Sequence, residues 1–318
     1  MSVFVITGGS GLVGTALSRL ILARGQEIII LTRNPPAVPP KNIITPETAG
    51  KFSYAQWDVG RQSIENGVIE KADYIIHLAG AGVADKRWTA KRKKEIAESR
   101  TKSSALVIKA LKEHSNKVKA VISASAIGWY GADPVGANHK PFIETDSADT
   151  AFLGETCKQW EDSIEPVTEL GKRLVKLRTG IVLSNEGGAL VSFKKPLQFG
   201  IATILGSGKQ IISWLHIDDL CRMYLQAVEN ENMQGVYNAV APQPVTNKTL
   251  TLQLAKAKRG NAFIPVHVPE WTLKLAVGEL SVEVLKSATV SADKIRKAGF
   301  SFLYPSLESA LNQLITKK

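Results

Sequence analysis

Four glycines near the start of the chain have the spacing of a phosphate-binding turn. An apolar run at residues 3–6 leads through Thr7 into Gly8-Gly9-Ser10-Gly11-Leu12-Val13-Gly14, and a helical pattern follows at once. Continuous apolar runs are typical of buried parallel strands, and glycine lets the backbone turn tightly and approach a ligand. A helix that begins here would offer free N–H groups and its positive end to a pyrophosphate. A turn that binds nothing is the alternative, and the strand–turn–helix context favours dinucleotide binding.

The end of the next apolar run indicates which dinucleotide is bound. Residues 28–31 form that run, it continues into Thr32 and Arg33, and no Asp or Glu occurs from residue 28 to residue 46. An acid at this position would bind the ribose 2′-hydroxyl of NAD, whereas a basic residue accepts the 2′-phosphate of NADP. The planar guanidinium of Arg33 suits a phosphate, so NADP(H) is favoured over NAD(H). The alternative is that Arg33 is an ordinary surface arginine.

The elements that must position these residues alternate along the chain. We expect further strands at residues 52–57, 74–78, 120–125 and 174–178, two helical segments over 91–113 and a helix at 156–163. Strands separated by helices predict right-handed βαβ units and therefore an α/β fold, a doubly wound (Rossmann) parallel sheet. We assign this dinucleotide-binding domain to residues 1–183.

The pattern changes after residue 183. Glycines punctuate a loop-rich stretch over residues 185–208, and a strand near 236–238 and helices near 247–258, 269–286 and 305–316 follow. We interpret residues 184–318 as a smaller, mixed substrate-side region. A strand and helix near 212–240 are expected to pack back on the core. In such folds ligands bind outside the C-terminal ends of the strands, so this region would form a wall of the cleft.

Composition excludes several classes of protein. With 44% hydrophobic and 22% charged residues, the 318-residue chain has the composition of a globular protein. No apolar run approaches the roughly 18 residues of a membrane span, so no membrane association is expected. The two cysteines, Cys157 and Cys221, form no disulfide framework, which favours a reduced, cytoplasmic location. The histidines and cysteines lack metal-ligand spacing, so no metal site is expected.

Positive charge is concentrated in one segment. Residues 86–119 contain twelve Lys or Arg and three Glu. Such a segment could attract an anionic ligand or nucleic acid, or it could be the solvated face of a helix. No aromatic residue interrupts the basic run at residues 91–94, which favours the solvated helix, and no nucleic-acid partner is expected.

Several segments together resemble a known family. The chain is similar to extended short-chain dehydrogenases/reductases in the glycine turn and in Trp57-Asp58-Val59, Ile76-His77-Leu78-Ala79-Gly80, Ile122-Ser123-Ala124-Ser125, Tyr130-Gly131 and Leu215-His216-Ile217-Asp218-Asp219-Leu220. It resembles more narrowly the atypical "NAD-dependent epimerase-like" or "cell-division inhibitor-like" subgroup. The segments that carry this closer likeness include Lys86-Arg87-Trp88-Thr89, Ser99-Arg100, Trp160-Glu161, Gly187-Gly188-Ala189-Leu190 and Ala298-Gly299-Phe300.

The resemblance implies a set of cofactor-binding positions. The glycine turn would hold the pyrophosphate, and Thr32 and Arg33 would meet the adenosine phosphate. Asp58 and Val59 would border the adenine, and residues 78–80 would line the cofactor at the end of the fourth strand. Glu95 and Arg100 would approach it from the following helix, and Leu183 would close over the nicotinamide. The full set is Gly8, Gly9, Ser10, Gly11, Leu12, Val13, Gly14, Thr32, Arg33, Asp58, Val59, Leu78, Ala79, Gly80, Glu95, Arg100, Ser123, Lys158 and Leu183. For the apolar members, core packing is the alternative role.

The catalytic residues of the larger family are only partly matched. Short-chain reductases place a tyrosine four residues before a lysine on one helical face, so that the phenol exchanges a proton with the substrate. Lys158 is identified with the lysine, but Gly154 stands at the tyrosine position and no tyrosine occurs between Tyr130 and Tyr224. Ser125 would polarise a carbonyl. Tyr130 is a candidate replacement donor, although a structural hydroxyl is the more ordinary role for it.

Two hypotheses about function therefore remain open. One is an NADP(H)-dependent oxidoreductase or epimerase-like enzyme that acts on an unidentified small carbonyl or carbinol with Ser125, Lys158 and Tyr130. The other is a non-catalytic NADP(H)-binding protein that senses redox state or regulates a partner. Helices near residues 91–113 and 156–163 resemble the pair through which many relatives dimerise, so a homodimer is also possible.

Overall fold

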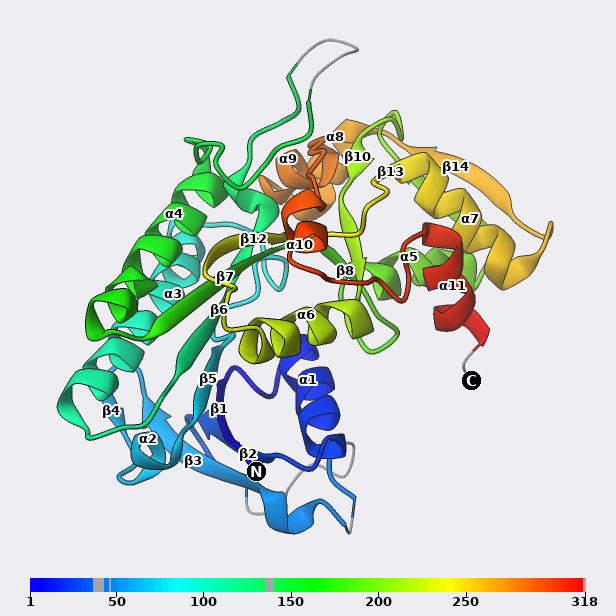
Figure 1. Cartoon of the computed structure of the whole chain (residues 1–318). Helices are drawn as coiled ribbons and strands as arrows, with labels where there is room; N and C mark the ends of the chain where they lie inside the picture. The colour runs from blue at the N-terminus through cyan, green and yellow to red at the C-terminus, as the bar shows by residue number, and fades with distance from the viewer. Residues whose placement is uncertain (37–42, 46, 135–139, 317–318) are drawn as a thin grey trace.

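An eight-stranded sheet forms the centre of the molecule (Figure 1). The computed structural model describes residues 1–36, 43–45, 47–134 and 140–316. The strand order is β12-β7-β6-β5-β1-β2-β3-β4; all neighbours are parallel except the short final pair. The strands are β1 (Val3–Thr7), β2 (Glu27–Thr32), β3 (Phe52–Asp58), β4 (Ser63–Ile64), β5 (Tyr74–His77), β6 (Ala120–Ala126), β7 (Arg173–Thr179) and β12 (Gly235–Ala239). The doubly wound α/β fold predicted from the sequence is confirmed.

Helices cover both faces of this sheet, which explains its continuous apolar strands. In β1, Phe4 and Ile6 belong to one hydrophobic core, whereas Val5 belongs to the other. Successive side chains of a strand point to opposite faces, so both faces must be buried. Helices α1 (Leu12–Ala23) and α6 (Ile217–Glu229) cover one face; α2 (Val68–Lys71), α3 (Ala90–Glu113) and α4 (Phe152–Ile164) cover the other (Figure 1).

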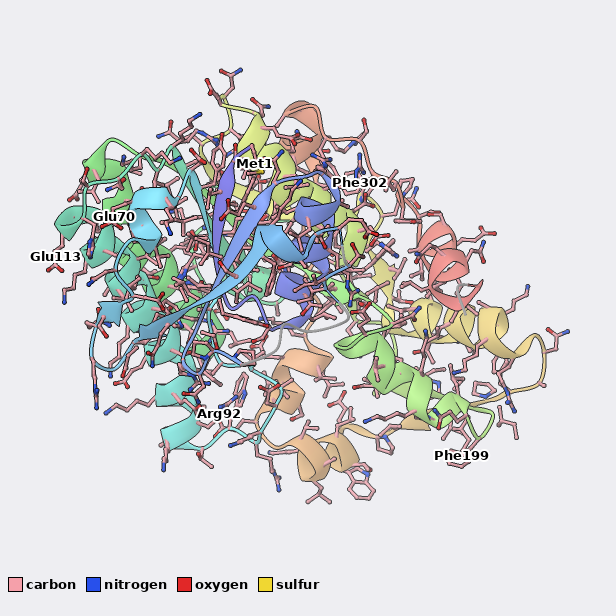
Figure 2. The ribbon with its side chains drawn as sticks, turned by 90° about the horizontal axis from the view of Figure 1, so that it is seen from below. Met1, Glu70, Arg92, Glu113, Phe199 and Phe302 are labelled. Carbon is pink, nitrogen blue, oxygen red and sulfur yellow. The ribbon has the colours of Figure 1, made fainter. Side chains whose placement is uncertain are left out.

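The remaining elements gather to one side of the sheet, at the upper right of Figure 1. Three two-stranded pairs occur there: β8 (Ile181–Leu183) with β11 (Trp214–His216), β9 (Ile201–Leu205) with β14 (Ile264–Val268), and β10 (Ile211–Ile212) with β13 (Val245–Thr246). The helices of this region are α5 (Ala189–Leu197), α7 (Asn247–Arg259), α8 (Glu270–Val277), α9 (Leu280–Leu285), α10 (Asp293–Lys297) and α11 (Leu307–Thr316). Elsewhere, between elements of the sheet domain, short 3₁₀ turns occur at Ala49–Lys51, Ile127–Trp129 and Glu165–Leu170. Phe199, 82% exposed, marks the outer rim of this region in Figure 2.

Three expectations about elements were wrong. Residues 91–113 lie in one helix, α3, whose two ends are marked by Arg92 and Glu113 in Figure 2. The helix continues through its polar middle because the hydroxyls of Ser103 and Ser104 both donate hydrogen bonds to the Arg100 carbonyl of the same helix. Residues 269–286 form two helices because Gly278 adopts a positive φ of 65°. The stretch expected to be mainly loops contains α5 and β9.

The last strand of the sheet comes from far along the chain. β12 pairs in parallel with β7, from Gly235 opposite Val175 to Ala239 opposite Thr179. The preceding helix α6 packs against α1, β6 and β7. Within the described residues, no helix is both long and apolar enough to cross a membrane.

Candidate functional site

The glycine turn connects β1 to α1 with almost no free space. A Cβ at Gly8 would lie 2.8 Å from the backbone of Leu78, and Gly8 has a φ of +68°. A Cβ at Gly14 would lie 2.5 Å from the Gly9 Cα and 2.6 Å from the Gly8 oxygen. These distances are too short for any side chain. The glycines therefore let the helix and the end of β5 pack directly against the turn.

The N-terminus of α1 is suited to an anion. Its N-cap, Gly11, provides no side-chain hydrogen bond, and the first turn contains no acidic residue. The Gly11 N–H donates to the Gly8 carbonyl, which closes the turn, and Ser10 and Gly11 are exposed. The amides of the first helical turn have no intrahelical acceptors and lie at the positive end of the helix dipole. This end of α1, with half-buried Leu12 and Val13, can bind a pyrophosphate.

The predicted adenosine side lies at the ends of β2 and β3. Thr32 is half-buried at the end of β2 and Arg33, directly after it, is exposed. Gln56 of the adjacent β3 donates its side-chain amide to the Arg33 carbonyl at 3.4 Å. Asp58 and Val59 are half-buried at the end of β3. The Arg33 guanidinium is thus available on the same sheet edge as the glycine turn.

Two residues without a predicted role join β1 to β5. The Thr7 hydroxyl oxygen accepts the N–H groups of Leu78 and Ala79, each at 3.1 Å, and lies 2.8 Å from Nδ1 of His77. Burial lowers the pKa of the completely buried His77 to about 4, so its ring is neutral. Thr7 and His77 therefore fix the position of Leu78-Ala79-Gly80 beside the glycine turn. The signal for this role was a polar residue at the end of each of these two strands, directly after its apolar residues.

Arg100 and Glu95 were predicted together but have different surroundings. Arg100 packs against Gly80, where a Cβ would lie 3.1 Å from its Cζ, and its Nη1 donates to the carbonyls of Ala81 and Ile96. Glu95 is exposed and forms a 2.8 Å ion pair with Arg92. Arg92 holds the pKa of this carboxyl below its ordinary value. Arg100 therefore lies at the predicted cofactor edge, whereas Glu95 pairs with another helix residue.

A network of buried polar side chains includes residues near the C-terminal ends of β6 and β7. The Ser125 hydroxyl donates to Glu161 at 2.6 Å, and Arg178 donates to both oxygens of the same carboxylate at 2.8 and 3.0 Å. Arg178 also donates to the Tyr130 hydroxyl at 3.1 Å, and Tyr130 donates to Asn238 at 2.7 Å. Ser125, Glu161, Arg178, Tyr130 and Asn238 are each at most 4% exposed. We call these five residues the buried network; no role was predicted for Glu161 or Arg178.

Of the three predicted catalytic residues, Ser125 and Tyr130 share the buried network, whereas Lys158 lies apart from them. Tyr130 is fully buried, and burial raises its pKa to about 12, so its proton is held tightly near neutral pH. Lys158 lies on the solvent side of α4, with its side chain 52% exposed, and pairs with Asp162 at 2.6 Å. Asp162 raises the pKa of Lys158. Lys158, which the family spacing identifies with the reductase lysine, thus points to solvent, and the face of α4 that points inward carries Cys157 and Glu161.

The last predicted positions are buried in the framework. Ser123 is fully buried in β6 and donates to the carbonyl of Ala124 at 3.1 Å. Leu183, also fully buried, ends β8 and belongs to the core that lies against α1 and α6. The glycines after it, Gly187 and Gly188, approach the Leu12 side chain. This segment therefore closes over the start of α1.

Known proteins resemble this chain along its whole length. The profile of the NAD dependent epimerase/dehydratase family matches residues 4–152, and a domain of unknown function matches residues 268–314. An epimerase family protein of Staphylococcus aureus is 35% identical over 317 residues, with both chains fully covered. One from Staphylococcus saprophyticus is 34% identical and covers 99% of this chain and 100% of its own length.

Solved structures give the same result. The human epimerase family protein (isoform 2), crystallised with NADPH, is 25% identical, has a TM-score of 0.85 and covers 99% of this chain and 100% of its own. The nucleoside-diphosphate sugar epimerase from Corynebacterium glutamicum is 27% identical with a TM-score of 0.73; the match covers 99% of this chain and 59% of that one. The chain therefore belongs to the epimerase family of these staphylococcal relatives and has the nucleotide-binding fold of extended short-chain dehydrogenases/reductases.

Proposed function

We propose that the protein binds NADP(H) in preference to NAD(H) across the C-terminal edge of β1, β2 and β5. The observation that carries this proposal is the pairing of an uncapped α1 N-terminus with an exposed arginine, Arg33, at the end of β2. The first suits the pyrophosphate of either dinucleotide, and the second suits the phosphate that NADP alone carries. The human relative crystallised with NADPH supports the same choice.

The Arg33→Ala variant tests the assignment. A charge-assisted bidentate contact contributes about 1.5–3 kcal/mol, so we expect roughly ten- to a hundredfold weaker NADPH binding and little change for NADH. Both affinities can be measured by calorimetric titration. Arg24→Ala is the control, because Arg24 lies at the opposite end of α1 and pairs with Glu229. If Arg33→Ala binds NADPH as tightly as the wild type does, the assignment is wrong.

We further propose that the bound cofactor does not serve the serine–tyrosine–lysine chemistry of short-chain reductases. This favours the non-catalytic, redox-sensing or regulatory alternative over an oxidoreductase that acts on a small carbonyl. The supporting observation is that Ser125 and Tyr130 donate their hydroxyls to buried acceptors while Lys158 pairs with Asp162 at the surface. We expect no NADPH oxidation above background across a panel of small carbonyls. Turnover that disappears in a correctly folded Lys158→Ala variant would contradict this proposal.

A further inference from the structure

The lobe that contains α5, β9, α7 and β14 carries positive charge without negative charge. No Asp or Glu occurs at residues 187–217 or 232–269, whereas these two stretches together contain seven Lys or Arg. The basic helix α3 is different, because its lysines form ion pairs with Glu98 and Glu279. A surface of one sign with no counter-charge of its own attracts partners of the opposite sign.

The cations of this lobe gather at one end, where α5 and α7 both terminate. The last turn of α5 contains Lys194 and Lys195, and that of α7 contains Lys256, Lys258 and Arg259. Burial and the nearby charge of Lys258 lower the pKa of Lys194, so the two helix ends lie close together. Among the described residues, no carboxylate forms an ion pair with any of these five cations. Cations offset the dipole of each helix end, but two such ends side by side leave an uncompensated positive charge.

Apolar side chains are exposed beside these cations. Phe199 is 82% exposed, Ile264 68% and Ile201 38%. Ile264 lies opposite Ile201 in the parallel pair β9–β14, so both side chains point to the same face. Arg259 lies against the start of β9, since a Cβ at Gly200 would be 3.5 Å from its Nη2. Phe199 marks the outer rim of the molecule in Figure 2, where a flat surface can reach it. We call the following six residues the basic tip: Lys195, Phe199, Ile201, Lys258, Arg259 and Ile264.

The chemistry of the basic tip fits an anionic lipid surface. In proteins that bind at a membrane interface, apolar side chains enter the headgroup–acyl boundary while Lys and Arg meet the lipid phosphates. Nucleic acid fits less well, because bases stack on aromatic rings and the exposed side chains of Ile201 and Ile264 are aliphatic. The contact needs no spanning helix, so the lengths of apolar runs in the sequence do not bear on it.

We propose that the basic tip binds reversibly to the surface of a bilayer that contains anionic phospholipid. Phe199 enters the interface, and the cations of the tip contact headgroup phosphates. The cofactor edge stays free, because α5 begins beside the glycine turn, where Gly188 approaches Leu12, and reaches the basic tip only at its other end. The proposal is therefore independent of the proposed cofactor site.

Co-sedimentation with lipid vesicles tests the proposal at about 0.1 M salt, where the Debye length is about 10 Å. We expect the wild type to bind vesicles of equal parts phosphatidylglycerol and phosphatidylcholine, to leave pure phosphatidylcholine unbound, and to dissociate as salt is raised. A triple variant should bind about a hundredfold more weakly, at about fivefold per charge: Lys195→Gln, Lys258→Gln and Arg259→Gln. Phe199→Ala should bind about tenfold more weakly, because it loses the inserted ring.

Matched controls separate the basic tip from the overall charge of the protein. A second triple variant removes the same charge from exposed positions of α3: Lys91→Gln, Lys94→Gln and Lys112→Gln. It should change vesicle binding by less than about twofold, because distant exposed charges are screened. Val282→Ala is the control for Phe199→Ala, since Val282 is 66% exposed on α9, apart from β14 in Figure 1. All variants should keep the unfolding temperature and the NADPH affinity of the wild type.

Each outcome supports or overturns the proposal. Losses in both basic-tip variants, with vesicle binding kept in both controls, support it. Wild-type protein that does not bind the anionic vesicles, or binds them no better than phosphatidylcholine, overturns it. Equal losses in the basic-tip and α3 triple variants would mean that net charge alone is responsible and also overturn it. Binding to a random-sequence DNA duplex without binding to vesicles would overturn the lipid assignment in favour of nucleic acid.

Discussion

At the scale of single residues, the buried network gives Ser125 and Tyr130 a structural role. Glu161 accepts hydrogen bonds from Ser125 and Arg178, and Tyr130 links Arg178 to Asn238 of β12. The network joins α4, β6, β7 and the strand contributed from far along the chain. Polar groups that are buried and mutually satisfied fix one arrangement of the elements that carry them. The hydroxyls of Ser125 and Tyr130, which suggested proton transfer, therefore help to hold these elements together.

The buried network predicts a strong dependence of stability on Glu161. Removing one partner of a buried ion pair costs about 3–5 kcal/mol, because the remaining charge is left uncompensated. We expect a loss of this size for Glu161→Ala and a smaller loss, about 1–3 kcal/mol, for Ser125→Ala. Urea denaturation measures both. Lys158→Ala should stay within about 0.5 kcal/mol of wild type, and an equal loss for all three variants would contradict the assignment.

His77 predicts how stability depends on pH. Burial lowers the pKa of His77 from 6.5 to about 4. Between these two values His77 is protonated in the unfolded chain and neutral in the folded chain. Stability should therefore fall as the pH is lowered from 7 to 5, by about 2 kcal/mol from this residue. Denaturation of wild type and His77→Gln at both pH values measures the effect. The variant should lose this part of the slope, with the exposed His267→Gln as control; an unchanged slope in His77→Gln would be inconsistent with a buried neutral ring.

At the scale of elements, local patterns predicted the glycine turn and every strand of the sheet except the two-residue β4. Strands β1, β2 and β5 are apolar runs buried on both faces, and each glycine of the turn has a steric reason. The face of α4 could not be predicted in the same way. Lys158 fits the family spacing, but only packing against α3 and β6 selects Cys157 as the inward residue one position earlier. A helix rotation of one residue is about 100°, which is enough to move a side chain from site to solvent.

The glycine turn gives the element-scale prediction. In Gly14→Ala the new Cβ would meet the backbone of Gly8 and Gly9 at 2.5–2.6 Å, so α1 must shift from the turn. Overpacking of this kind typically costs about 1–3 kcal/mol, and the shift should weaken NADPH and NADH equally. Gly50→Ala is the control, because nothing lies within 4 Å of a Cβ there. Thermal unfolding and dinucleotide titration of both variants test this, and normal binding by Gly14→Ala would contradict the close packing.

At the scale of the whole molecule, the strand order explains where a ligand binds. From β1 the chain continues to β2 on one side of β1, and it later returns to β5 on the other side. Where the strand order reverses in this way, a crevice opens at the C-terminal ends of the strands. The glycine turn, Arg33 and Arg100 all belong to this edge. The short strand pairs β8–β11, β9–β14 and β10–β13 could not be predicted, because each joins segments that are distant in sequence and its strands are only two to five residues long.

The most direct test of the central claim is the ratio of wild-type affinities for NADPH and NADH, measured by calorimetric titration under one salt condition. The uncapped α1 N-terminus should allow both dinucleotides to bind, and Arg33 should make NADPH bind roughly ten- to a hundredfold more tightly. Equal affinity for the two dinucleotides, or tighter binding of NADH, would contradict the NADP(H) assignment.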